Sequence, residues 1–356
     1  MSRPPVPITM RITVRLQSGS GGRTIGLRME ELLHEILRRT GAGERVALCT
    51  VVGARGSTPQ RRGARMIVTA DGRTVGTLGG GCVEAEVRKT ALELLSRGES
   101  KLLDFRLDHD YGWDDGLICG GVMDIHVHCV APGQEKEFAD ALDALKQRRR
   151  VPLKIAYEQA GERREFVDEI GPGPRLVIAG AGHVAQAVAE IASKLDFRVT
   201  VIDDRPDYAS ESRFPVAEQR IVGSIEDELR GCGIDDNTYV VIVTRGHSRD
   251  GQALGAVIDS PARYVGLIGS KRKIKTIFDD LHQSGVALEK LTRVHAPIGY
   301  EIGAVTVPEI AVSICAELVA VRRGLGDDPA RPMKVRADQV AQWVHGPRKP
   351  AGECRE

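Results

Sequence analysis

The segment Arg175-Leu176-Val177-Ile178-Ala179-Gly180-Ala181-Gly182-His183-Val184-Ala185 decides the fold of the second half of this chain. It begins as a short apolar run, as a buried strand would, and residues 184–195 continue it with the apolar spacing of a helix. Small residues at Gly180, Gly182 and Ala185, between a strand and a helix, are typical of a loop that binds a phosphate at the helix N-terminus. We therefore predict a Rossmann-type phosphate loop here.

An acidic residue supports this interpretation. Asp203 directly follows the next predicted strand, residues 198–202, and lies after Gly180 at about the 20-residue spacing at which an acid accepts hydrogen bonds from a ribose. Asp204 is the other candidate for that role. His183 lies inside the loop, where its imidazole either contacts the ligand or caps the helix.

Further short apolar runs at residues 240–244 and 264–268 have the character of strands buried on both faces of a parallel sheet. With a closing helix at residues 310–322, they predict a doubly wound parallel sheet. Arg245 and His247 follow the first of these strands, so we place them at the carboxyl edge of the sheet as contacts for a phosphate or a pterin. The basic run at residues 271–273 is interpreted as solvated.

The first half has the pattern of a mixed α/β domain, in which predicted helices and strands alternate. The predicted helices are residues 29–39, 83–97 and 135–146, and the predicted strands are residues 45–52, 64–70, 74–78, 101–107 and 122–130. A polar hairpin at residues 151–170 precedes Gly171-Pro172-Gly173-Pro174, which cannot continue a helix or a strand. We expect flexible tails at 1–28 and 327–356, an N-terminal α/β domain at 29–150, a hairpin and linker at 151–174, and the Rossmann-type domain at 175–326.

Two of the seven cysteines stand next to glycines. Cys82 follows Gly79-Gly80-Gly81 and begins a predicted helix, whose N-terminal N–H groups would favour a thiolate. Cys119 precedes Gly120-Gly121, which would let a bulky ligand approach the backbone. The other cysteines in predicted strands and helices are expected to pack as small apolar residues: Cys49, Cys129 and Cys315. An odd number of cysteines without a Cys-x-x-Cys motif disfavours a disulfide framework and a zinc site.

Asp124, His126 and His128 alternate along one predicted strand and therefore share a face. This face either holds a metal ion or is a polar outer face with Ile125 and Val127 turned inward. We favour the polar outer face.

Composition excludes several classes of protein. A formal net charge of +1 with interspersed acidic and basic residues argues against binding to nucleic acid or to an anionic membrane. The apolar run at residues 311–320 is about half the length of the ~20 residues that cross a bilayer and contains Glu317. The first 23 residues have no signal-peptide pattern, so we expect a cytoplasmic location.

A series of motifs across both halves resembles the XdhC/CoxI family. The motifs, in order, are Gly53-Ala54-Arg55-Gly56-Ser57-Thr58-Pro59, Gly79-Gly80-Gly81-Cys82-Val83-Glu84, Cys119-Gly120-Gly121, the Gly180 loop and His295-Ala296-Pro297-Ile298-Gly299. The resemblance extends from about Glu30 to Gly324. Val305-Thr306-Val307-Pro308-Glu309 departs from the family's more usual Thr-Pro-Glu-Glu, although Glu309 is kept.

The resemblance implies a maturation factor for molybdenum hydroxylases, which binds molybdenum cofactor as molybdopterin or its dinucleotide. Such a factor holds the cofactor while a cysteine desulfurase supplies sulfur, and inserts it into an apo molybdenum hydroxylase of the xanthine, aldehyde or carbon monoxide dehydrogenase type. Cys119 matches the family's Cys-Gly-Gly position and is our first choice for contact with the cofactor and its molybdenum. Cys82 matches a cysteine of the CoxI-like branch. We expect a homodimer that is a cofactor chaperone rather than a catalyst.

Two other functions remain open from the sequence. One is an NAD(P)-dependent oxidoreductase, with Asp203 on the ribose and His247 or His295 as a proton donor. The other is a nucleotide-sensing Rossmann module without catalysis, which leaves the two glycine-flanked cysteines unused. We also expect that Gly180→Val would block the approach of the cofactor phosphate without unfolding the domain.

Overall fold

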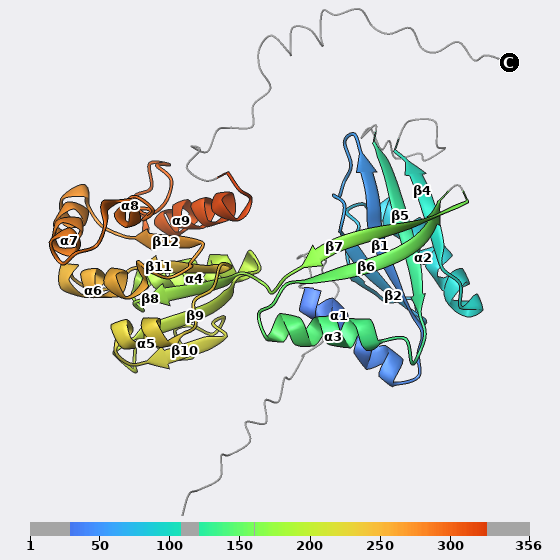
Figure 1. Ribbon diagram of the computed structural model, residues 1–356, viewed down its shortest axis with the longest axis horizontal. Helices are drawn as coiled ribbons and strands as arrows, with labels where there is room; N and C mark the ends of the chain where they lie inside the picture. Colours follow the sequence, from blue (N-terminus) through green and yellow to red (C-terminus); the bar gives the residue numbers. More distant parts are fainter. Residues whose placement is uncertain (1–28, 108–120, 160, 326–356) are drawn as a thin grey trace, which may run out of the picture. The chain divides into compact units, whose positions relative to one another are not determined.

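The computed structural model describes residues 29–107, 121–159 and 161–325 and contains two units, Met1–Pro172 and Gly173–Glu356 (Figure 1). The first is a mixed α/β unit, and the second carries a five-stranded parallel sheet with helices on both faces. The predicted fold class is therefore confirmed. None of the helices in the described ranges has the length and apolar character of a membrane span.

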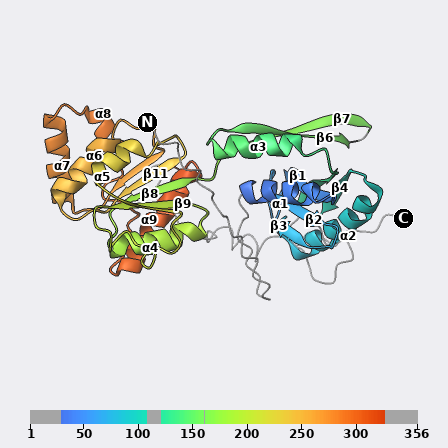
Figure 2. The same cartoon turned by 90° about the horizontal axis from the view of Figure 1, so that it is seen from below.

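An antiparallel sheet with the strand order β3-β2-β1-β5-β4 forms the centre of the first unit. Its strands are β1 (Val46–Arg55), β2 (Arg65–Thr69), β3 (Thr74–Gly76), β4 (Lys101–Arg106) and β5 (Val122–Val130), and its helices are α1 (Met29–Gly41), α2 (Gly81–Arg97) and α3 (Lys136–Lys146). Side chains of β1 alternate between two cores. Ala47 and Cys49 pack with α2, whereas Val46 and Leu48 pack with α1 and α3. Figure 2 shows α2 on one side of this sheet and α1 and α3 on the other.

The polar hairpin predicted before the Gly-Pro segment is present as β6 (Val151–Gln159) and β7 (Glu162–Ile170). Leu153 and Ile170 pack into the core that α1 and α3 form, and Phe166 packs on Val52 of β1. We expected a hairpin and linker at 151–174, outside the N-terminal domain. The inward side chains of the hairpin pack in the cores of the first unit, which ends at Pro172.

The second unit contains a parallel sheet with the strand order β10-β9-β8-β11-β12. Its strands are β8 (Arg175–Ala179), β9 (Arg198–Asp203), β10 (Gln219–Val222), β11 (Thr238–Ile242) and β12 (Tyr264–Leu267). Its helices are α4 (His183–Lys194), α5 (Ile225–Gly231), α6 (His247–Val257), α7 (Lys271–Gln283), α8 (Leu288–Leu291) and α9 (Val307–Arg322). In β8, Ile178 faces the core of α4 and α9, while Val177 faces the core of α5, α6 and α7. Burial on both faces explains why the strand is apolar throughout.

Two segments interpreted as loops are the first turns of helices. His247 begins α6, and Lys271 begins α7 after Ser270, whose hydroxyl accepts a hydrogen bond from the Lys273 N–H group. Charged residues in these first turns obscured the helical pattern. The three short elements β10, α5 and α8 also had no sequence prediction.

Candidate functional site

The strand order of the second unit reverses between β8 and β11, since β9 lies on one side of β8 and β11 on the other. In open α/β sheets, a ligand binds at such a reversal, outside the carboxyl ends of the strands. Here α4 begins at His183 after β8, and α6 begins at His247 after β11. Two helix N-termini, each carrying unpaired N–H groups and a partial positive charge, therefore flank the same crevice.

The two glycines of the phosphate loop have different roles. Gly180 has a φ of +105°, and a Cβ atom there would lie 2.6 Å from the carbonyl oxygen of Val243. A side chain at this position would strain the loop and push against the chain after β11, so our expectation that Gly180→Val leaves the domain folded is wrong. Gly182 has a φ of −76°, and no atom lies within 4 Å of the position that its Cβ would take. Gly182 is the glycine that faces open space.

Both predicted histidines are exposed at the start of a helix. Gly182 is the N-cap residue of α4, and His183 follows as its first helical residue. The structure therefore does not show His183 as the cap. His247 has the equivalent position in α6, whose N-cap residue is Gly246. The two imidazoles belong to the two helix N-termini at the carboxyl edge of the sheet.

Asp203 supports the phosphate loop from below. Its side chain is 2% exposed and accepts hydrogen bonds from the Ala181 N–H group at 2.8 Å and from the Arg205 Nε atom at 2.8 Å. Burial by itself raises the pKa of this carboxyl group, but the hydrogen bonds from Arg205 and Ala181 hold it below its usual range. A ribose contact stays a prediction, and a ribose would have to compete with these donors.

Asp204, the second candidate acid, is paired with the loop after β11. Its Oδ2 atom lies 2.6 Å from Arg249 and 3.5 Å from Arg245. The Arg245 side chain is 55% exposed, and among the described residues this longer contact is its one ion pair, so it can turn toward an anion in the crevice. The sequence did not reveal the role of Arg249.

A second pair under the crevice was also missed. Asp250 is fully buried in α6 and accepts hydrogen bonds from the Thr244 N–H group at 3.2 Å and from the Thr244 hydroxyl. Lys273 of α7 forms an ion pair with the same carboxylate. This lysine was assigned to a solvated basic run. The available signal was Asp250 itself, an acid in the first turn of a helix that follows a buried strand.

Three glycine motifs of the first unit come together. A Cβ atom at Gly121 would overlap the carbonyl oxygen of Ser57, and one at Gly79 would lie 2.6 Å from the carbonyl oxygen of Pro59. Glu84, in the first turn of α2, accepts a hydrogen bond from the Gly79 N–H group at 3.1 Å. Close backbone approach therefore explains why glycine stands at positions 79 and 121.

Cys82 lies in the first turn of α2, as the sequence predicts, and is partly exposed. Cys119 lies outside the described residues. The cysteines predicted to be packing residues are buried, and burial raises the pKa of each of their thiols: Cys49, Cys129 and Cys315. Of the cysteines in the described ranges that the sequence singled out for chemistry, Cys82 is the accessible one.

The face of β5 that carries Asp124 and His126 is not an outer face. Asp124 is 9% exposed and His126 is 3% exposed, and the ring of His126 lies 5.9 Å from the ring of Tyr157 in β6. The hairpin covers this face, which corrects our expectation of a solvated surface. Among the described residues, no group of three or more His, Cys, Asp or Glu side chains is arranged to hold a metal ion.

His295 takes part in a buried network of the second unit. Glu317 of α9 accepts hydrogen bonds from the Tyr264 hydroxyl at 2.5 Å and from the Gly299 N–H group at 2.8 Å, and its other oxygen lies 3.0 Å from His295 Nδ1. Burial alone raises the pKa of Glu317, but His295, Tyr264 and Gly299 hold it below its usual range. The network joins the His-Ala-Pro-Ile-Gly segment to α9 and β12.

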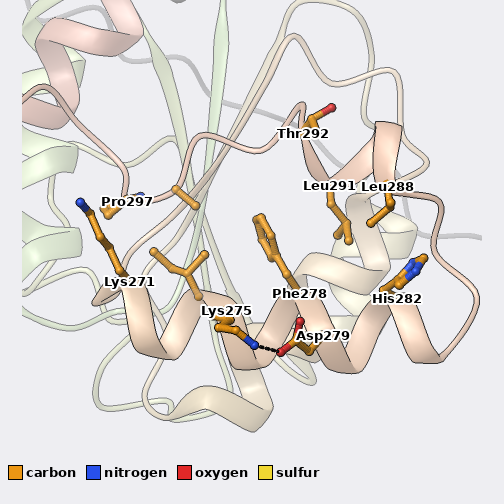
Figure 3. A pocket seen from close by; sticks show the side chains of 11 residues that line it. Lys271, Lys275, Phe278, Asp279, His282, Leu288, Leu291, Thr292 and Pro297 are labelled. Atoms are coloured by element: carbon orange, nitrogen blue, oxygen red, sulfur yellow. Dashed lines mark hydrogen bonds and ion pairs between the residues drawn. The ribbon is translucent and has the colours of Figure 1, made fainter.

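The second unit also has an apolar groove of about 650 Å³ that the sequence did not indicate. Figure 3 shows Phe278 of α7 together with Leu288 and Leu291 of α8 along this groove. Lys271 stands at one end of α7, and Lys275 pairs with Asp279. None of the residues predicted to bind a cofactor lines it.

Comparison with known sequences assigns the chain to a protein family. The sequence profile of the XdhC and CoxI family matches residues 40–106, and that of the XdhC Rossmann domain matches residues 176–318. The chain belongs to the XdhC and CoxI family. The two XdhC matches include the motifs at Gly53 and Gly79 in one unit and the crevice loops in the other.

Three relatives of this XdhC-family chain come from well-known bacteria. The uncharacterized protein YqeB of Escherichia coli is 32% identical over 80% of this chain and 46% of its own length, so the chain spans about half of YqeB. A probable xanthine dehydrogenase subunit of Bacillus subtilis is 26% identical over 79% of this chain and 94% of that protein. The molybdenum cofactor insertion chaperone PaoD of Escherichia coli is 27% identical over 82% of this chain and 88% of that protein.

A solved structure shares the XdhC fold. The crystal structure of a xanthine dehydrogenase (BH1974) from Bacillus halodurans has a TM-score of 0.73 and 23% identity, and the match covers 88% of this chain and 99% of that one. This similarity supports the arrangement of strands and helices described above.

Proposed function

We propose that this chain is a maturation factor that binds molybdenum cofactor in the cytoplasm and inserts it into an apo molybdenum hydroxylase of the xanthine, aldehyde or carbon monoxide dehydrogenase type. The observation that carries the proposal is the open space at Gly182, between two helix N-termini. Family membership and the similarity to the molybdenum cofactor insertion chaperone PaoD support the proposal. The proposal includes a homodimer and a cysteine desulfurase that supplies sulfur to the held cofactor.

The crevice residues suit the phosphate part of such a cofactor. The backbone at Gly182 and Gly246 is free of contacts on its Cβ side, so a phosphate group can approach the N–H groups at the starts of α4 and α6. His183, Arg245 and His247 follow the carboxyl ends of β8 and β11, and we expect their side chains to bind the anion. Asp203 keeps the loop in place through the Ala181 N–H group.

The cysteines provide the softer contact. The bound cofactor supplies a molybdenum centre, for which thiolate is a suitable soft ligand. Cys82 is partly exposed in the first turn of α2, so a ligand can reach its thiol. Cys119 lies outside the described residues. It remains our first candidate for contact with the cofactor, because Cys119-Gly120-Gly121 matches the family motif.

Gly182→Val is expected to weaken cofactor binding at least about tenfold. The valine side chain would fill the open space and keep the phosphate away from the N–H groups at the start of α4, and a lost hydrogen bond to a charged group costs about 1.5–3 kcal/mol. Titration of the purified chain with molybdenum cofactor, NADH and NADPH measures this. Gly231→Val is a matched control, since Gly231 lies at the end of α5 and also has open space at its Cβ position. Tight nicotinamide binding with substrate turnover, and no cofactor retention, would favour the oxidoreductase and overturn the proposal. Tight nucleotide binding without turnover would favour the sensing module.

Cys119→Ala is expected to reduce the molybdenum that the chain retains after gel filtration, while Cys49→Ala leaves it unchanged because Cys49 is buried in the core. Metal analysis of the parent and the two variants makes the comparison. If Cys119→Ala keeps the parental amount and Cys82→Ala loses it, the role of first cofactor contact passes to Cys82.

A further inference from the structure

A basic pocket lies in the first unit, between the end of β1 and the β6–β7 hairpin. It has a volume of about 510 Å³, and three arginines line it: Arg55, Arg62 and Arg164. Asp124 is the one acidic residue among the described residues that form its lining. The pocket therefore carries an excess of positive charge.

The three guanidinium groups are held in position without being fully neutralised. Arg55 is 71% exposed, and its ion pair with Asp124 is long, at 3.7 Å. Arg62 lies over the ring of Phe166, 4.8 Å from its centroid. Arg164 donates a hydrogen bond to the amide oxygen of Gln159 at 3.0 Å and lies 3.4 Å from Glu162.

Buried polar atoms that lack hydrogen bonds lie near Asp124. Thr50 Oγ1, Asp124 Oδ1 and His126 Nδ1 have no hydrogen-bond partner among the residues that the structure describes. Thr50 pairs with His126 across β1 and β5, and Gly53 pairs with Asp124, so the three residues are neighbours in the sheet. Of the three, Asp124 lines the pocket, so the attraction of the pocket for an anion depends on its arginines.

Asp124, the one acidic residue among the described lining residues, does not offset the arginines. It packs against the backbone of Gly53, where a Cβ atom would overlap its carboxyl group. Burial raises the pKa of Asp124, Arg55 lowers it, and Asp104 on the neighbouring strand raises it again. One acid against three arginines leaves the lining with a net positive charge.

We propose that this pocket binds the phosphate group of a small molecule through Arg55, Arg62 and Arg164, with the Tyr157 ring as one wall. Guanidinium groups form paired, charge-assisted hydrogen bonds with phosphate oxygens. All of its lining residues belong to the first unit, whereas the Gly182 crevice belongs to the second. The phosphate comes either free from solution or as part of a monoester whose ring packs on Tyr157.

Isothermal titration of the full chain with inorganic phosphate and with guanosine monophosphate tests the proposal. The measurements use Gly182→Val protein, so that the crevice of the second unit does not contribute. Arg164→Gln is expected to weaken binding about tenfold or more, since a hydrogen bond to a charged group is worth about 1.5–3 kcal/mol. Arg163→Gln is the matched control, because Arg163 is exposed on the same strand and does not line the pocket.

Tighter binding of the monoester assigns the phosphate to an organic ligand, and equal affinity assigns it to free phosphate. Raising the ionic strength is expected to weaken either interaction. The proposal is overturned if neither probe binds at millimolar concentration, or if Arg163→Gln and Arg164→Gln have the same effect.

Discussion

Asp168→Ala is expected to destabilise the first unit by about 3–5 kcal/mol, the usual cost of removing one partner from a buried ion pair. Asp168 of β7 pairs with Arg65 of β2 at 2.8 Å, and the Arg65 side chain is only 2% exposed. The pair uses the Nη1 atom of Arg65, which also donates to the Gly63 carbonyl oxygen at 3.2 Å, and the Nε and Nη2 atoms have no hydrogen-bond partner among the described residues. Without the carboxylate, the guanidinium would remain buried with an uncompensated charge.

Urea unfolding followed by circular dichroism measures this loss, and hydrogen exchange of the β2 peptides assigns it to the first unit. Glu165→Ala on the same strand is the control, because its ion pair with Lys154 is exposed and 3.8 Å long. Combining Asp168→Ala with Arg65→Met is expected to recover much of the stability. A single Asp168→Ala variant as stable as Glu165→Ala would show that Arg65 reaches water by another route.

Gly180→Ala is expected to destabilise the second unit by about 2–6 kcal/mol, the sum of backbone strain and overpacking. The strain follows from the φ of +105°, and the overpacking from the approach to Val243 and Thr244. Gly182→Ala, two residues later, is expected to change stability by less than about 1 kcal/mol, because its Cβ would meet no atom.

Thermal unfolding of the two variants beside the parent chain makes this comparison. Equal stabilities would mean that the loop at Gly180 relaxes away from β11, and the distinction between a packing glycine and a ligand-facing glycine would then be lost. The same pair of variants separates effects on folding from effects on the cofactor.

Sequence patterns determined the main elements of the second unit because burial on both faces leaves a continuous apolar run. β8 and β11 are such runs, and the small residues that follow β8 have to fit between neighbouring loops. The helix starts at His247 and Lys271 were missed because their first turns are polar. Polar residues look alike in sequence whether they begin a helix or form a loop. The packing of the helix on the sheet, which the sequence does not show, distinguishes the two cases.

The candidate site could be predicted only as separate pieces. The Gly180 loop and Cys82 were recognised from local sequence. The residues that restrict the glycines come from distant segments. Val243 leaves no room for a side chain at Gly180, and Ser57 leaves none at Gly121. Asp124 was assigned to a solvated face because alternation shows which residues share a face, but not whether a later hairpin covers it.

The position of α9 in the second unit has a consequence for synthesis on the ribosome. One face of the parallel sheet is covered by α4 and α9 together, and Glu317 of α9 closes the network with His295 and Tyr264. Because α9 is the last described helix to be translated, that face stays open until nearly the whole unit has left the ribosome. The described strands of the first unit are complete by Ile170, so this unit can fold earlier. A nascent chain would therefore expose the apolar face of a parallel sheet last, which is the stage at which this protein most needs protection from aggregation.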